Sequence, residues 1–363
     1  MSQVKLPGSV RVAPPPKIKT GPSFFSRVFG FAGLLVVGAL ILGFFKLLVY
    51  SQNFLAPESA SREVAVAIPN GASNSQIGQI LYRAGVIRSP EAFAWALKLR
   101  SWVGKPASLK AGEQALDPAK DVWATIATLH KGNFKLYPFT VPEGRTMADI
   151  AASVEAAGLG RADDFLALCR DPAFIASLGV RASTLEGYLF PETYSFPRGT
   201  PLKTIVAAMT EQFFRVWNKY SATAAMKGMS LADAVTLASI VEKETSQPNE
   251  RPLIAGVFLN RLEKRMRLQT DPTVIYGLKS FNGNLTRADL ENPHPYNTYV
   301  IEGLPPGPIA SPGEEAIKAV LNPAPGDYLY FVSRNDGTHH FSTTLAEHNR
   351  MVNRYQRAPN RGS

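Results

Sequence analysis

The stretch Leu231–Ser246, LADAVTLASIVEKETS, has the pattern of a helix whose buried face ends in a carboxylate. At 3.6 residues per turn, one face of this helix carries Leu237, Ile240, Val241 and Glu244. An inward-facing carboxylate resists ionisation, so its pKa rises and it can hold a proton near neutral pH. The pattern therefore predicts a general acid at Glu244, or else a carboxylate that caps a helix or pairs with a buried arginine.

The flanking residues predict where this helix begins and ends. Ser230 is a candidate N-cap, with Asp233 at the capping-box position, and Pro248 ends the helix soon after Glu244. Glu242 is rotated by about 200° from Glu244 around the helix axis. We therefore expect Glu242 to be more exposed to water and to have no part in the chemistry.

The composition is that of a folded protein with two or three modest domains. The chain has 363 residues, of which 45% are hydrophobic and 19% are charged. Half of the net charge of +10 lies in residues 1–27, which hold five basic residues and no acidic one. The interleaved basic and aromatic motifs of nucleic-acid modules are absent, so we expect no nucleic-acid partner.

The 18 residues Val28–Phe45 are uncharged and mostly apolar. A run of this length predicts a membrane span, and the basic residues before it place the N-terminus in the cytoplasm. We therefore predict a basic cytoplasmic tail at 1–27, a single-pass anchor in the inner (cytoplasmic) membrane at 28–50, and a linker at 51–62. Everything beyond the linker is then expected to be periplasmic, or otherwise extracytoplasmic.

An internal repeat follows the linker. IPNGASNSQIGQILYRAGV (Ile68–Val86) recurs as VPEGRTMADIAASVEAAGL (Val141–Leu159), and in each copy a β run ends at Pro-x-Gly before a helix that Ser73 or Thr146 can cap. A second helix and a returning strand complete a β-α-α-β plan that resembles the LysM carbohydrate-binding module. The alternative is a duplicated scaffold that binds no ligand.

The chain beyond the repeat changes to a helical pattern, followed by loops rich in Pro, Gly and Asn and by a hairpin that turns at NDG. The fold expected is α+β: a transmembrane helix, LysM-like βααβ modules, and a mainly helical catalytic domain with long loops. The predicted boundaries are 63–132 for the first module, 133–199 for the second or intermediate unit, 200–358 for the catalytic domain, and 359–363 for a tail.

Aromatic side chains alternate in the segment that closes the second module, namely Tyr188, Phe190, Tyr194 and Phe196. In an extended segment they share one face, which can stack on sugars or fill the core.

Several kinds of chemistry lack their motifs in this chain. It has no Gly-rich phosphate loop, no G-x-S-x-G elbow, no H-E-x-x-H and no paired Cys motif, and its histidines lack zinc-ligand spacing. We expect no cofactor and no metal. Carboxylates remain, and Glu186, Glu192 and Asp271 could approach Glu244 from the loops to form the pair that glycosidases require. A route with one carboxylate also exists if the sugar supplies its own nucleophile.

Five stretches carry a resemblance to a known family: LASIVEKET, RLQTDPTVIYG, YNTYVIEGLPPGPIASPG, NPAPGDYLYFV and HHFSTTLAEHN. They closely resemble the YceG-like endolytic murein transglycosylases, the MltG family, over roughly Val64 to Tyr355. The resemblance implies a lyase that cuts inside peptidoglycan strands between N-acetylmuramic acid and N-acetylglucosamine, leaving a 1,6-anhydro end. Glycan synthases, the penicillin-binding proteins, are then natural partners.

The resemblance also implies the roles of individual residues. The essential glutamate of the family is the second in its E-K-E-T motif, which is Glu244 here. Residues that match family motifs are assigned to glycan positioning or to holding the cleft: Gln269, Thr270, Asp271, Tyr296, Asn297 and Asn322. Tyr188 and Glu192 are further candidates for substrate binding, from the aromatic segment and the loop carboxylates.

Two other functions remain open at this point. A hydrolytic muramidase would use water, with Asp271 or another carboxylate as its second group. A glycan-binding scaffold for cell-wall assembly is not an enzyme, and position 244 would then accept any polar residue.

Overall fold

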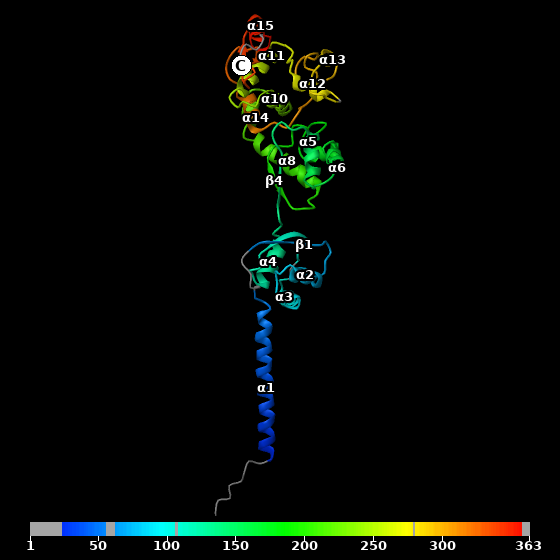
Figure 1. Cartoon of the computed structure of the whole chain (residues 1–363), viewed down its shortest axis with the longest axis vertical. Coiled ribbons are helices and arrows are strands. Elements are labelled where there is room, and N and C mark those ends of the chain that lie inside the picture. Colours follow the sequence, from blue (N-terminus) through cyan, green and yellow to red (C-terminus); the bar gives the residue numbers. More distant parts are fainter. Residues whose placement is uncertain (1–23, 56–61, 106–107, 279, 358–363) are drawn as a thin grey trace, which may run out of the picture. The chain divides into compact units, whose positions relative to one another are not determined.

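The computed structural model describes residues 24–55, 62–105, 108–278 and 280–357. The chain divides into two compact units, with the boundary between Asn133 and Phe134 (Figure 1). Within the described part of the chain, helices are combined with three separate two-stranded sheets, which gives the expected α+β class. The finer boundaries predicted at residues 132, 199 and 358 stay predictions.

The first unit begins with the long helix α1 and continues with a two-stranded sheet and three helices around one core. Its elements are α1 Phe24–Gln52, β1 Val64–Ile68, α2 Asn74–Arg83, α3 Pro90–Trp102, β2 Gly112–Leu116 and α4 Val122–Lys131. Strands β1 and β2 pair antiparallel, with Val64 opposite Leu116. Ser73 caps α2 through a capping box with Gln76, which confirms the start predicted for this helix.

The predicted membrane anchor at 28–50 is wrong. A span needs a helix with about 20 consecutive, predominantly apolar residues, and no helix among the described residues is long and apolar enough to cross a membrane. The single-pass topology and the inner-membrane localisation depended on this anchor and are corrected with it. Residues 1–23, most of the predicted basic tail, and 359–363, the predicted C-terminal tail, lie outside the described residues.

The second unit opens with the other copy of the repeat. Its elements are β3 Tyr137–Thr140, α5 Met147–Ala156, α6 Ala162–Leu168, α7 Pro172–Ser177 and β4 Thr193–Phe196. Strands β3 and β4 pair antiparallel, with Tyr137 opposite Phe196, and Thr146 caps α5 through a capping box as predicted. The short helix α7 is an addition to the β-α-α-β plan.

The remaining elements of this unit are mainly helical, as expected, and include the predicted hairpin near the end. They are α8 Leu202–Trp217, α9 Ser221–Met226, α10 Leu231–Glu244, α11 Arg251–Glu263, α12 Asp271–Gly277, α13 Arg287–Glu291, α14 Glu314–Leu321, β5 Tyr330–Ser333, β6 His339–Ser342, α15 Leu345–Val352 and a π-helical turn Asn353–Arg357. Strands β5 and β6 pair antiparallel, with Tyr330 opposite Ser342, around the NDG turn.

Helix α10 is the central element of the second unit. It begins after the predicted N-cap Ser230, and every residue from Ala234 to Val241 is buried. It packs against α11, α12 and α14. The hydroxyl of Ser239 accepts a hydrogen bond from the backbone of Ile309, 3.0 Å away, so a loop covers the side of α10 that the sequence pattern left to water.

Glu242 is therefore not exposed, contrary to the expectation from the helix pattern. Its side chain is 5% exposed and forms an ion pair of 2.8 Å with Arg251 at the start of α11. Its second oxygen accepts a hydrogen bond from the backbone of Gly313, 3.0 Å away, and Glu143 lies 3.5 Å from the same guanidinium. Helical periodicity alone could not show that distant loops would enclose this face.

We expect Glu242→Gln to destabilise the second unit by about 3 kcal/mol, because it leaves a buried arginine without its main counter-charge. Chemical denaturation, followed by circular dichroism, measures this free energy of unfolding. The matched control is Glu211→Gln, which removes an exposed pair with Arg215 and should change little. Equal effects of the two substitutions would contradict a structural role for Glu242.

Candidate active site

Glu244 is the last residue of α10 and lies on a cavity of about 570 Å³. The other walls come from the segment before α12, from the hairpin, and from α15 with the turn that follows it. The lining residues used below are Arg261, Gln269, Thr270, Asp271, Tyr299, Tyr330, Phe331 and His339. Glu244, which the sequence pattern predicted to face inward, thus lies at the edge of a cavity.

The surroundings of Glu244 shift its proton affinity strongly. Burial raises its pKa from 4.5 to about 7, and the negative charge of Asp271 acts in the same direction. A hydrogen bond from Thr270 and the electrostatic influence of His339 and Arg261 act the other way. The carboxyl group is thereby poised to give or to take a proton near neutral pH, as the sequence analysis predicted.

Thr270 donates a hydrogen bond to Glu244, and neighbouring threonines hold Thr270 in place. The hydroxyl of Thr270 donates a hydrogen bond to Oε1 of Glu244. The backbone N–H of Thr270 donates to the hydroxyl of Thr298, 3.0 Å away, and Thr273 donates to the carbonyl of Thr270 at 2.7 Å. Just before them, Gln269 has a φ of 51°, an uncommon conformation for a residue other than glycine. This network holds the Thr270 hydroxyl in one place.

Asp271 is a second carboxylate on the same cavity. Its Oδ1 accepts a hydrogen bond of 2.7 Å from the hydroxyl of Tyr299. Neither Glu186 nor Glu192, the other loop carboxylates considered from the sequence, lines this cavity.

Arg261 is a buried cation beside the carboxylates. Its Nε donates to the carbonyl of Leu329 at 2.7 Å, and another nitrogen donates to the carbonyl of Leu268 at 2.8 Å. The guanidinium lies over the ring of Tyr330, 5.3 Å from its centroid. Arg261 therefore joins the hairpin to the segment before α12 and supplies fixed positive charge under the cavity.

His339 also lines the cavity, although the sequence analysis considered the histidines only as zinc ligands. The ring Nδ1 of His339 lies 2.7 Å from Oε2 of Glu250, the residue just before α11. The signal available from the sequence is the motif HHFSTTLAEHN, which begins at His339 and carries part of the family resemblance.

Two further motif residues support the loop around the cavity. The amide of Asn297, whose residue is 1% exposed, donates to the carbonyls of Asp289, Leu290 and Asn292, and so holds the loop before it closed. The ring of Tyr296 packs on that of Tyr276 at 4.8 Å. Neither residue lines the cavity of Glu244.

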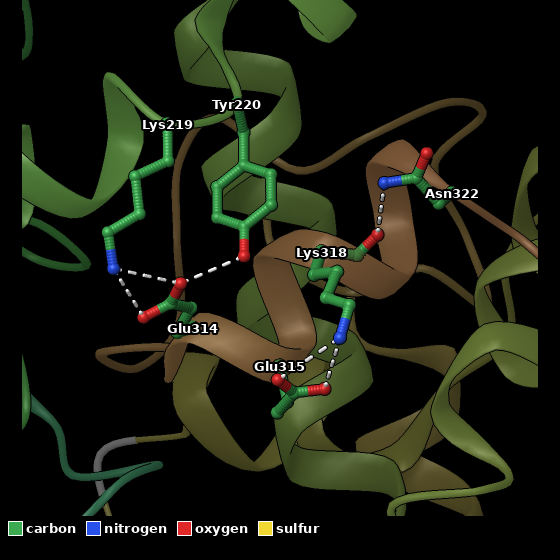
Figure 2. Close-up of polar contacts among 6 residues, drawn as sticks. All are labelled: Lys219, Tyr220, Glu314, Glu315, Lys318 and Asn322. Atoms are coloured by element: carbon green, nitrogen blue, oxygen red, sulfur yellow. Dashed lines mark hydrogen bonds and ion pairs between the residues drawn. The ribbon is translucent and has the colours of Figure 1, made fainter.

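The other candidates lie elsewhere in the fold. Asn322 ends α14, and its amide contacts the carbonyl of Lys318 (Figure 2). At the opposite end of that helix, Glu314 accepts hydrogen bonds from Lys219 and Tyr220, which ties α14 to the turn after α8 (Figure 2).

The aromatic segment lies in the core. Tyr188 is 2% exposed and packs edge to face on Phe213. Phe190 and Phe196 are also buried, so the core-filling interpretation of this segment holds for them. Glu192 lies in a separate hollow beside β4 and α8.

These features describe an α+β protein in which a partly buried carboxyl group with a raised pKa lies on a cavity at the end of a helix. The sequence profile of the YceG-like family matches residues 66–354, and the chain belongs to this family. The resemblance seen in the sequence is thus confirmed.

Alignments with named relatives cover most of the chain. A Bacillus subtilis protein named endolytic murein transglycosylase is 34% identical over 339 residues, covering 88% of this chain and 91% of that protein. A protein of the same name from Streptococcus pneumoniae is 31% identical over 360 residues, covering 90% of this chain and 65% of that protein. A crystal structure of a YceG-like protein from Listeria monocytogenes is 36% identical and matches 80% of this chain and all of that chain, with a TM-score of 0.55.

We expect Glu244→Gln to stabilise the fold at pH 8 but not at pH 4. Glu244 has a pKa of about 7 in the folded state against 4.5 for the free group, so burial of its charge costs stability progressively as the pH rises between these values. Glutamine never ionises and can still accept the Thr270 hydrogen bond. Thermal unfolding at both pH values measures the difference, and a glutamine variant that is less stable at pH 8 would contradict the shift.

Proposed function

We propose that this protein is an endolytic murein transglycosylase. It cleaves the β-1,4 bond between N-acetylmuramic acid and N-acetylglucosamine inside peptidoglycan strands and leaves a 1,6-anhydro end. The observation that carries the proposal is Glu244, a carboxyl group with a pKa of about 7 on a cavity in a member of the YceG-like family. The names of the relatives from Bacillus subtilis and Streptococcus pneumoniae support the same reaction.

Glu244 supplies the acid–base chemistry of this reaction. In its protonated form it gives a proton to the glycosidic oxygen as the bond to C1 of the muramic residue breaks. The 6-hydroxyl of that residue then attacks C1, and Glu244, now a carboxylate, is the final acceptor of the hydroxyl proton. A pKa near neutrality suits both steps, because neither protonation state is strongly preferred.

The charges around Glu244 suit a cationic, oxocarbenium-like sugar. Asp271 lies on the same cavity and carries the sign that favours positive charge on the sugar ring. Arg261, fixed by two backbone carbonyls, favours the carboxylate form of Glu244 after proton donation. Tyr330 lines the cavity and offers an aromatic ring to the substrate.

The substrates and partners follow from this reaction. An enzyme that cuts within strands ends the elongation of newly made glycan, so nascent strands are its substrate and the glycan synthases, the penicillin-binding proteins, are partners by proximity.

A hydrolytic muramidase is the second candidate, and one observation favours it: the second carboxylate, Asp271, lines the same cavity as Glu244. With water in place of the 6-hydroxyl, the product would have a reducing end instead of an anhydro end. Mass spectrometry of the products separates the two functions directly.

We expect Glu244→Gln to lower kcat by at least about 10⁴-fold, because one group serves as both acid and base. Release of anhydro-ended fragments from intact glycan strands is the measurement, with circular dichroism to show that the fold persists. The matched control is Glu211→Gln, the same change at an exposed carboxylate paired with Arg215, which should keep near wild-type activity. An active Glu244→Gln variant would refute the assignment.

We also expect Thr270→Val to move the alkaline limb of the pH–rate profile to higher pH. The hydroxyl of Thr270 lowers the pKa of Glu244, so its removal raises that pKa, and the acid form then persists to higher pH. Valine keeps the shape of the side chain. The pH dependence of kcat/KM measures the effect, and a shift to lower pH would show that the hydrogen bond has the opposite influence.

A further inference from the structure

His339 is held in a fixed orientation by Glu250. It is the first residue of β6, and both oxygens of Glu250 bind it: Oε1 accepts its backbone N–H at 2.8 Å, and Oε2 lies 2.7 Å from its ring Nδ1. The two side chains are 14% and 8% exposed. The ring also packs edge to face on Phe331 at 5.5 Å. These contacts leave the imidazole with one orientation.

The partner at Nδ1 decides which nitrogen faces the substrate. A carboxylate can only accept, so Nδ1 carries a proton, and in the neutral imidazole Nε2 is then a proton acceptor. Across the described residues, no hydrogen-bond donor or acceptor reaches Nε2 of His339, and the residue lines the cavity of Glu244. Nε2 is therefore available to a bound sugar.

His339 interacts electrostatically with Glu244, together with Asp271 and Arg261. Arg261 has only donors, which face backbone carbonyls, and Asp271 accepts the hydroxyl of Tyr299. The hydroxyl of Thr270 is used in the bond to Glu244. Among these four side chains, His339 is the one with a free nitrogen that can take up a proton and then release it.

We propose that His339 is a second catalytic residue, which takes the proton of the 6-hydroxyl and passes it to Glu244. The proposal rests on the transglycosylase function and deepens it. As Glu244 protonates the glycosidic oxygen, the bond from that oxygen to C1 breaks. The oxygen of the 6-hydroxyl bonds to C1 and its proton moves to Nε2. The imidazolium then returns one proton to the Glu244 carboxylate, directly or through one water, and both residues regain their starting states.

The electrostatics of the pair suit this relay. The imidazolium forms while Glu250 accepts the bond from Nδ1, which stabilises the positive charge. At the same moment Glu244 has become a carboxylate, so the relay is driven by the attraction of opposite charges within one cavity. A base at Nε2 also gives the internal hydroxyl an advantage over water in the attack on C1.

The test is the product ratio of His339→Asn on intact glycan strands. The asparagine amide can still donate to Glu250 in the position of Nδ1, but it has nothing at the position of Nε2. We expect kcat to fall about 10- to 100-fold, KM to change little, and the share of reducing ends to rise as water replaces the 6-hydroxyl. A purely structural role would lower activity without altering the type of end.

A second variant, Glu250→Gln, leaves the imidazole in place. Its oxygen must still accept the backbone N–H of His339, so its NH₂ faces Nδ1 and donates to it, which moves the ring proton to Nε2 and removes the acceptor there. We expect the same rise in reducing ends as for His339→Asn. This variant decides the question if His339→Asn proves unstable in thermal unfolding.

The matched control is His340→Asn. His340 is the next residue of β6 and contacts Glu347 at 3.4 Å, but it does not line the cavity, so the variant should keep the wild-type rate and products. Wild-type rates with only anhydro ends for both His339→Asn and Glu250→Gln would overturn the relay and leave the proposed function intact. Reducing ends alone from the wild-type protein would overturn both.

Discussion

The buried ion pair between Glu242 and Arg251 is the constraint on which the second unit depends. It joins the end of α10 to the start of α11, and the 3.0 Å bond from Gly313 to Glu242 brings in the loop before α14. Glu143 adds the turn before α5. Since an arginine enclosed in this way is stable only with its counter-charges in place, these segments must assemble together. Glu244, two residues beyond Glu242, is thereby fixed at the edge of the cavity.

Glu242 and Glu244 are separated by one residue but lie in different electrostatic environments. Glu242 is neutralised by a fixed arginine, whereas Glu244 meets a hydroxyl donor and distant charges of both signs. Burial alone would suppress ionisation of Glu244, and Thr270, His339 and Arg261 restore part of it. The resulting pKa of about 7 costs stability as the pH rises from 4.5 to about 7, and it suits the proton transfer proposed for this group.

The local parts of the fold could be predicted from the sequence, and the non-local parts could not. Ser73, Thr146 and Ser230 act as N-caps because a cap depends on only a few consecutive residues. The inward position of Glu244 follows from helical periodicity. The burial of Glu242 and the pairing of Glu250 with His339, 89 residues later, depend on distant segments that no local pattern specifies. The anchor predicted from the uncharged run at 28–45 is contradicted, because no helix in the described part of the chain is long and apolar enough to span a membrane.

The site is assembled where secondary-structure elements begin or end. Glu244 is the last residue of α10, Asp271 the first of α12, Glu250 precedes α11, and His339 begins β6. Rigid elements fix these positions, while their ends leave polar side chains facing the cavity. The arrangement is sensitive to register, because consecutive residues of a helix point about 100° apart, and a shift of α10 by one residue would turn Glu244 away from the cavity. The Glu242–Arg251 pair lies in the last turn of α10 and therefore fixes the position of Glu244 through geometry.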